Sequence, residues 1–155
     1  MTESKDHADV KIHPPILTVI HILAAYLLKW FVNPLAAPPA LELFGFALVV
    51  IGFCLGAAAF LAFRKKRTTV MPHGSVSAIV SEGIYRFTRN PIYLGFLLMI
   101  IGIPLTSGAT FWGLALAPIF VLSANRLVIE REEFYLEKKF GDEYTRYKSR
   151  VRRWI

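Results

Sequence analysis

A short polar run at the start of an apolar segment has the composition of an anion-binding site. Asn90 precedes Pro91, and a residue before proline is pushed out of the helical region, so Asn90 is expected to cap a helix that Pro91 opens. The first turn of such a helix exposes backbone N–H groups, and Arg89 adds a full positive charge beside them. This run favours a carboxylate or phosphate ligand. The alternative is an arginine that reaches the membrane surface at an ordinary helix start, and it remains open.

A second charged group lies at the end of another apolar segment. Arg126 and Glu130 are four residues apart, so they would share one helix face, about 6 Å apart along the axis. An arginine in an apolar span costs roughly 2.5–3.5 kcal/mol at the bilayer centre and less near its end, so such a pair indicates a functional site. A helix-end salt bridge is the alternative. Both polar groups are predicted on the same side of the membrane, where they can meet in one pocket.

Other kinds of reactive site find little support. The four histidines, among them His73, have no metal-ligand spacing, so no metal site is predicted. Cys54 is the single cysteine, which excludes an intrachain disulfide. The sequence has no glycine-rich phosphate loop and no Gly-x-Ser-x-Gly nucleophile motif. The net charge is +7, but the basic residues flank apolar stretches, so membrane lipids rather than nucleic acid are the expected partners.

The elements that must position these residues are membrane-spanning helices. Of the 155 residues, 55% are hydrophobic and 19% are charged. Residues 34–63 contain one acid, Glu42, and no Lys or Arg, while residues 92–125 contain no charge at all. A domain this small has too little interior to bury two such blocks. The sequence therefore predicts an integral membrane protein with an all-α fold, a helical bundle of about four transmembrane helices.

The apolar stretches divide the chain into parts of one domain. They cover residues 16–32, 41–63, 92–105 and 111–129, and the third is short for the roughly 20 residues that a span needs. The predicted parts are a tail (1–15), a first helical hairpin (16–63), a long loop (64–91), a second hairpin (92–129) and C-terminal helices (130–155). The last part is expected to break at Gly141 and to be helical again up to Trp154. Gly52 and Gly56 have a GxxxG-like spacing that favours close helix packing within or between chains.

Charge in the loops predicts the orientation. Residues 33–40 and 104–110 carry no Lys or Arg, whereas residues 64–67, Arg86, Arg89 and eight basic residues from Arg131 onward lie on the other side. Basic loops stay in the cytoplasm. Both termini and the loop before Pro91 are therefore expected to be cytoplasmic. The compact size and the absence of organelle signals fit a prokaryotic inner membrane.

Two motifs in this order resemble a known enzyme family. The first is Gly83-x-Tyr85-x-x-x-Arg89-Asn90-Pro91-x-Tyr93-x-Gly95, which is similar to the RHPxYxG signature of isoprenylcysteine carboxyl methyltransferases. Phospholipid N-methyltransferases share that signature more loosely. The second is Arg126-x-x-x-Glu130-x-Glu132-Glu133, followed by Phe140-Gly141 and Glu143-Tyr144. Together the motifs extend over residues 68–155.

The resemblance implies an S-adenosylmethionine-dependent methyltransferase whose cytoplasmic pocket is closed by the C-terminal helices. A lipophilic acceptor would enter from the bilayer. By position, Arg126 would engage the acceptor and Glu130 would act beside it in catalysis. The residues expected to hold the cofactor are Ser77, Ala78, Ile79, Val80, Tyr85, Arg89, Asn90, Pro91, Ile92, Tyr93, Glu130 and Glu133. Asn90 replaces the family's histidine, Ser77-Ala78 replaces its His-Glu pair, and a contact from His73 or Glu132 is left open.

Two other function classes remain as alternatives. Membrane sterol reductases that use NADPH carry a signature similar to HPNYxGE, but here Phe96 follows Gly95 and Asn90 precedes the proline. A membrane scaffold or small transporter would leave both charged groups without a purpose. For a methyltransferase, the acceptor is either the carboxylate of an isoprenylcysteine-like molecule or a lipid amine or other small amphiphile, and the residues do not choose between them.

Overall fold

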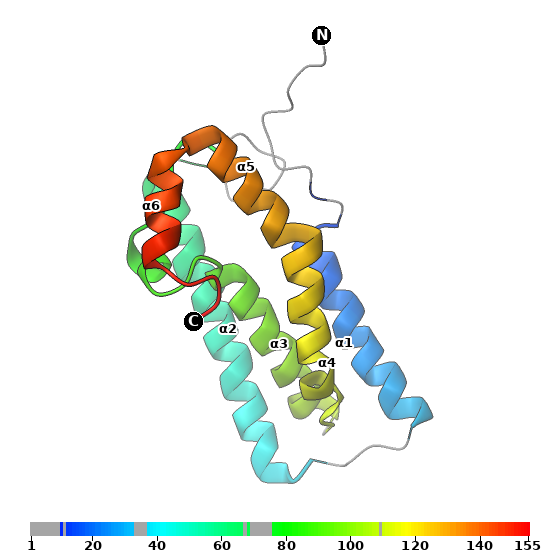
Figure 1. Ribbon diagram of the computed structural model, residues 1–155. Coiled ribbons are helices and arrows are strands. Elements are labelled where there is room, and N and C mark those ends of the chain that lie inside the picture. The colour runs from blue at the N-terminus through cyan, green and yellow to red at the C-terminus, as the bar shows by residue number, and fades with distance from the viewer. Residues whose placement is uncertain (1–9, 11, 33–36, 67, 69–75, 109) are drawn as a thin grey trace.

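The protein is a bundle of long helices with two shorter helices across one end (Figure 1). The computed structural model describes residues 10, 12–32, 37–66, 68, 76–108 and 110–155. In chain order the elements are α1 (Pro14–Phe31), α2 (Pro39–Lys66), a 3-10 helix (Gly83–Arg86), α3 (Pro91–Gly108), α4 (Trp112–Ala124), a π-helical turn (Asn125–Ile129), α5 (Glu130–Phe140) and α6 (Asp142–Arg150). The predicted all-α fold is confirmed.

The long helices have the length and surface of membrane spans. Helix α1, helix α2 and the continuous helical run Trp112–Phe140 are long and apolar enough to cross a bilayer, and Pro91–Ser107 is a shorter apolar helix. On α2, large apolar side chains face outward, with Leu43 74% and Phe53 66% exposed. Lipid tails, unlike water, solvate such side chains at no cost. The chain is therefore an integral membrane protein.

Helices α2 and α3 approach each other through facing glycines. A Cβ atom added to Gly52 would lie 2.7 Å from the carbonyl oxygen of Gly95, and one added to Gly102 would lie 2.6 Å from that of Gly45. Only glycine allows two helix backbones to come so close. These contacts fix the first turns of α3 against α2, and with them the polar run that precedes Pro91.

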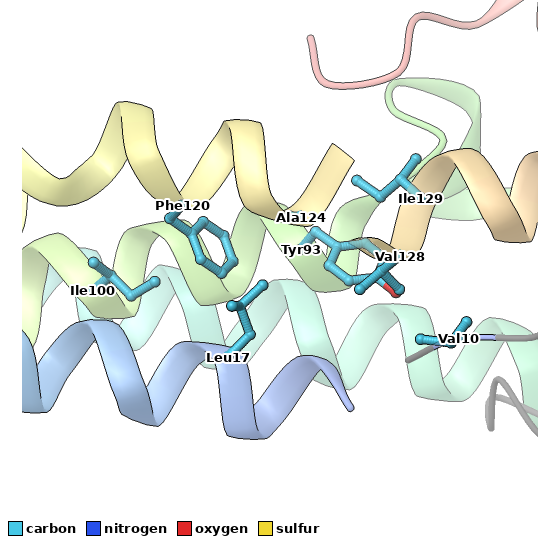
Figure 2. Packing of buried hydrophobic residues seen from close by; sticks show 8 residues of the cluster. All are labelled: Val10, Leu17, Tyr93, Ile100, Phe120, Ala124, Val128 and Ile129. Carbon is cyan, nitrogen blue, oxygen red and sulfur yellow. The ribbon is translucent and has the colours of Figure 1, made fainter. Parts of the chain in front are cut away.

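A buried apolar cluster joins α1, α3 and α4 below the polar end of the bundle (Figure 2). Phe120 and Ile100 are fully buried in it. His21 also belongs to this interior: its Nδ1 lies 2.8 Å from the carbonyl oxygen of Leu17, and its ring meets Phe120 edge to face. Within the described residues there is no group of His, Cys, Asp or Glu side chains that could hold a metal ion.

The last five residues, 151–155, form an extended segment that we call the C-terminal strap. Gly141 breaks the helix where expected and adopts a positive φ of 52°. The prediction of a helix up to Trp154 is wrong, because α6 ends at Arg150. The reason is a competing set of backbone hydrogen bonds. The carbonyl oxygen of Arg152 accepts from the backbone N–H of Arg89 at 3.0 Å, which holds the strap beside the start of α3.

The polar elements gather at one end of the bundle (Figure 1). The start of α1, the end of α2, the start of α3 and the helices α5 and α6 all lie there, whereas the end of α1 and the start of α2 lie at the opposite end. This arrangement brings the Arg89 run and the charged residues after Arg126 to the same end.

Candidate active site

A cavity of about 650 Å³ lies where the helical bundle meets α5 and α6. Its wall is mainly apolar and aromatic, with a few charged side chains, which is the usual make-up of a pocket for a small molecule. The lining residues are His13, Pro14, Pro15, Phe60, Phe63, Val76, Ala78, Ile79, Val80, Tyr85, Arg89, Asn90, Ile92, Tyr93, Phe96, Ile129, Glu132, Glu133, Tyr135, Leu136, Tyr144 and Tyr147.

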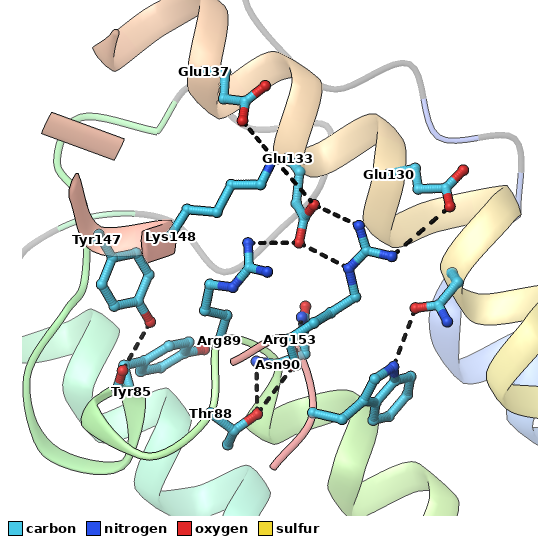
Figure 3. A network of polar contacts seen from close by, with 12 residues as sticks. Tyr85, Thr88, Arg89, Asn90, Glu130, Glu133, Glu137, Tyr147, Lys148 and Arg153 are labelled. Atoms are coloured by element: carbon cyan, nitrogen blue, oxygen red, sulfur yellow. Dashed lines mark hydrogen bonds and ion pairs between the residues drawn. The ribbon is translucent and has the colours of Figure 1, made fainter. Parts of the chain in front are cut away.

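Glu133 is the centre of a buried ion-pair network (Figure 3). Its carboxylate, 7% exposed, lies 2.8 Å from Arg89 Nη1. It also accepts two hydrogen bonds from Arg153, from Nη2 at 2.7 Å and from Nε at 3.1 Å. One carboxylate on α5 therefore joins the run before α3 to the C-terminal strap.

Arg89 keeps unused donor capacity at the wall of the cavity. Its side chain is only 9% exposed. The contact with Glu133 is an ion pair rather than a well-directed hydrogen bond, and the buried Nε has no acceptor among the described residues. The guanidinium of Arg89 still contributes a positive charge to the cavity wall, and this charge suits an anionic group of a ligand.

Glu132 contributes a carboxyl group to the wall of the same cavity. Its carboxylate accepts a hydrogen bond of 2.9 Å from the hydroxyl group of Tyr93, which is itself buried on α3. The neighbouring cations Arg89 and Arg153 pair with Glu133 instead. Glu132 therefore remains oriented by a neutral donor, and it can receive a cationic group of a ligand.

Three tyrosines from two elements, the 3-10 helix and α6, line the remaining wall as neutral phenols. The hydroxyl group of Tyr147 on α6 donates to the carbonyl oxygen of Tyr85 at 2.8 Å, which ties α6 to the 3-10 helix. Burial raises the pKa of Tyr144 to about 12, and Glu133 adds to the rise. Burial likewise raises the pKa of Tyr85 and of Tyr147 well above the usual range. At neutral pH all three offer aromatic faces and hydroxyl groups without charge.

Asn90 is held by the C-terminal strap. Its backbone carbonyl accepts the N–H of Leu94, which is the first hydrogen bond of α3. Its side-chain amide donates to the carbonyl oxygen of Arg153 at 2.9 Å, and the hydroxyl group of Thr88 donates to the same oxygen at 3.2 Å. The side chain of Asn90 thus fixes the strap to the cavity wall.

The cavity brings together most of the residues that the sequence singled out. Those that line it are Ala78, Ile79, Val80, Tyr85, Arg89, Asn90, Ile92, Tyr93 and Glu133. Four others lie outside the lining: Ser77 and Arg126 are exposed, Pro91 is buried in the first turn of α3, and Glu130 lies 3.8 Å from Arg153 Nη1. The roles assigned to these side chains stay predictions. His73 lies outside the described residues.

The second motif reaches the cavity through residues other than Arg126 and Glu130. The residues Asn125–Ile129 form a π-helical turn, which holds more residues than a regular turn and so shifts the register of the helix after it. In the structure the cavity is lined by Glu132 and Glu133 of α5 rather than by Glu130. Tyr144 and Tyr147, missed as site residues, are recognisable only as apolar positions of the amphipathic helix α6.

Comparisons with known proteins agree with this architecture. Residues 41–143 match the phospholipid methyltransferase family. The chain is 29% identical over 113 residues to protein-S-isoprenylcysteine O-methyltransferase B of Arabidopsis thaliana, covering 70% of this chain and 55% of the relative. It is 31% identical over 113 residues to protein-S-isoprenylcysteine O-methyltransferase of Homo sapiens, covering 72% and 39%.

A bacterial relative carries a different name. Methanethiol S-methyltransferase 1 of Bradyrhizobium diazoefficiens is 37% identical over 68 residues, covering 44% of this chain and 22% of the relative. The chain thus spans about half or less of the length of these three relatives. No solved structure matches it. The family match covers well over half of the chain, so this protein belongs to the phospholipid methyltransferase family.

Proposed function

We propose that this protein is an S-adenosylmethionine-dependent membrane methyltransferase that acts on a lipophilic acceptor. The observation that carries the proposal is the cavity at the end of the bundle, which is lined by a cation, Arg89, and an oriented carboxyl group, Glu132, within apolar and aromatic walls. Membership of a methyltransferase family supports this function over an NADPH-dependent reductase or a scaffold.

The side chains of the cavity fit the chemistry of S-adenosylmethionine. The molecule has a carboxylate, an ammonium group, a sulfonium group and an apolar, aromatic adenosine part. Arg89 would hold the carboxylate, and Glu132 would attract the cationic part. Tyr85 and Ile79, together with the other apolar residues of the wall, would contact the adenosine part.

The protein's contribution to catalysis is alignment in a dry site. When bound, S-adenosylmethionine supplies an electrophilic methyl group on its sulfonium sulfur. An in-line displacement needs the acceptor atom held opposite the leaving sulfur, and it needs water kept out. The ion pairs of Glu133 with Arg89 and Arg153 keep α5, the strap and the start of α3 together over the cavity. They would exclude water and hold the site in one geometry.

The acceptor is an amphiphile in this proposal, with its reactive group in the cavity. A carboxylate acceptor, as in isoprenylcysteine, forms an ester and releases no proton. A lipid amine must lose a proton when it gains a methyl group, and Glu132 is a carboxylate of the cavity wall that would accept it. The predicted roles of Arg126 toward the acceptor and of Glu130 are part of the proposal, although neither side chain lines the cavity.

We also place the protein in a prokaryotic inner membrane with the cavity facing the cytoplasm. The basic residues in the last turn of α2 and those of α6 lie at the same end as the cavity. Basic residues accumulate on the cytoplasmic side of membrane proteins. A cytoplasmic site also gives access to S-adenosylmethionine, which is made and used in water.

Transfer of a radiolabelled methyl group in proteoliposomes tests the proposal. The acceptor panel is S-farnesyl N-acetylcysteine, phosphatidylethanolamine and a short-chain thiol. We expect label in one lipophilic acceptor, and a loss of roughly a hundredfold or more in kcat/KM with Glu132→Gln. Arg126→Gln and Glu130→Gln in the same assay test the roles predicted from the sequence. Absence of transfer to every acceptor, with intact and folded protein, would contradict the proposed function.

A further inference from the structure

A second, wholly apolar hollow of about 450 Å³ lies between α2 and α3 within the membrane span. Its wall consists of glycines and apolar side chains, including Phe53, Gly56 and Ala57 of α2 and Met99 of α3. Phe53 is 66% exposed, so the hollow opens sideways toward lipid. We call this hollow the α2–α3 groove.

The α2–α3 groove adjoins the candidate active site. Phe60, Ile92 and Phe96 line both hollows. Along α3 the groove extends from Ile92 to Met99, which is about 10 Å of helix. One end of the groove therefore lies next to the cavity that Arg89 and Glu132 line, and only these shared side chains stand between the two.

The two glycines of the GxxxG-like pair have different roles. Gly52 touches the backbone of Gly95 and is needed for close packing of α2 on α3. Gly56, one turn nearer to the active site, has no heavy atom within 4 Å of the position that a Cβ atom would take. The Gly52–Gly95 contact forms the floor of the groove, and the missing side chain at Gly56 keeps the groove open above it.

We propose that the α2–α3 groove binds the apolar tail of the methyl acceptor, and that Gly56 determines whether a long tail is accepted. This inference rests on the proposed function, because the tail belongs to the molecule whose polar group reacts in the cavity. A bilayer is as apolar as the groove, so burial of the tail yields little hydrophobic energy. The groove instead fixes where the polar end of the acceptor is placed, which is an effect of orientation.

Photolabelling tests where the tail lies without any need for turnover. The probe is S-farnesyl N-acetylcysteine with a diazirine near the end of its tail, added to protein in phosphatidylcholine nanodiscs. We expect adducts on residues 53–60 of α2 and 92–99 of α3. Gly56→Leu fills open space rather than clashing, and it is expected to lower the adduct yield roughly tenfold or more. It should also lower the ratio of kcat/KM for farnesyl against short-tailed acceptors by a similar factor.

A matched control and a second binding measurement separate the outcomes. Phe46→Leu changes a lipid-facing residue of α2, 57% exposed and outside the groove, and should leave labelling unchanged. Adducts of Gly56→Leu within about twofold of wild type would overturn the inference. So would equal labelling of the groove by a phosphatidylcholine with a diazirine in its tail, which would identify an ordinary lipid as the occupant. A wild-type dimer that Gly56→Leu dissociates would likewise overturn it, because it would identify a second copy as the occupant. If wild type binds S-adenosylmethionine but the probe does not label the groove, the tail-binding role of the groove is refuted and the proposed function stands. If wild type neither binds S-adenosylmethionine nor transfers a methyl group, both the proposed function and this inference are refuted.

Discussion

The buried carboxylate of Glu133 gives the sharpest test of how the site is held together. Glu133→Gln keeps the shape of the side chain but leaves Arg89 and Arg153 without their common counter-charge. Removal of one partner from a buried ion pair typically costs about 3–5 kcal/mol, because a charge stays buried alone. At 1.36 kcal/mol per factor of ten, the population of molecules with the strap detached should rise roughly 10²- to 10⁴-fold.

Hydrogen exchange measures this opening, because the amide of Arg89 is protected by the carbonyl of Arg152 in the strap. Peptides that cover the strap and the start of α3 should exchange faster in Glu133→Gln by about the factor given above. Glu137→Gln is the matched control: Glu137 pairs with Lys148 at 2.6 Å, but both side chains are 38% exposed. Such exposed pairs contribute about 1 kcal/mol or less. Equal exchange in the two variants would refute the view that the Glu133 network fixes the strap.

Three further predictions follow from other contacts. Gly102→Leu places a Cβ atom 2.6 Å from the carbonyl oxygen of Gly45. The free energy of unfolding, followed by thermal unfolding in detergent, should fall by about 1–3 kcal/mol or more. An unchanged unfolding midpoint would contradict this close packing of α2 on α3. Trp154→Phe removes a hydrogen bond of 3.1 Å to Asn125. The free energy of strap opening, measured by hydrogen exchange, should fall by about 0.5–1.5 kcal/mol. An unchanged opening free energy would mean that this bond contributes nothing. Burial raises the pKa of Tyr144 to about 12, whereas the unfolded value is about 10. The neutral phenol therefore contributes fully to the free energy of unfolding below pH 10, and this contribution is lost between about pH 10 and 12. A circular dichroism titration should find this loss of stability smaller in Tyr144→Phe.

Much of the fold could be predicted from the sequence, because a bilayer imposes simple rules on it. Uncharged runs of sufficient length must be spans, and Gly141 marks the break between α5 and α6. The course of the chain after Arg150 was not predictable in this way. The sequence there is compatible with a helix, and its extended form depends on carbonyl groups that accept hydrogen bonds from Thr88, Arg89 and Asn90, far away in the chain.

The candidate site was predictable where local rules position a side chain, and unpredictable where helix geometry departs from them. Arg89 and Tyr93 follow from the proline-opened helix, since both lie within one turn of Pro91 and reach the cavity. The π-helical turn at Asn125–Ile129 shifts the register of the helix after it, and the residue types there do not reveal such a turn. Glu132 and Glu133 line the cavity, while the roles of Arg126 and Glu130 stay predictions.

Binding of S-adenosylmethionine to the detergent-purified protein tests the central claim most directly. Calorimetry should give saturable binding to wild type, with affinity reduced roughly tenfold or more in Glu132→Gln, because a carboxylate of the cavity wall is lost. Glu143→Gln, an exposed residue of α6 outside the cavity, should bind as wild type does. Absence of S-adenosylmethionine binding, or binding that Glu132→Gln leaves unchanged, would contradict the account. Binding of NADPH alone would indicate a reductase.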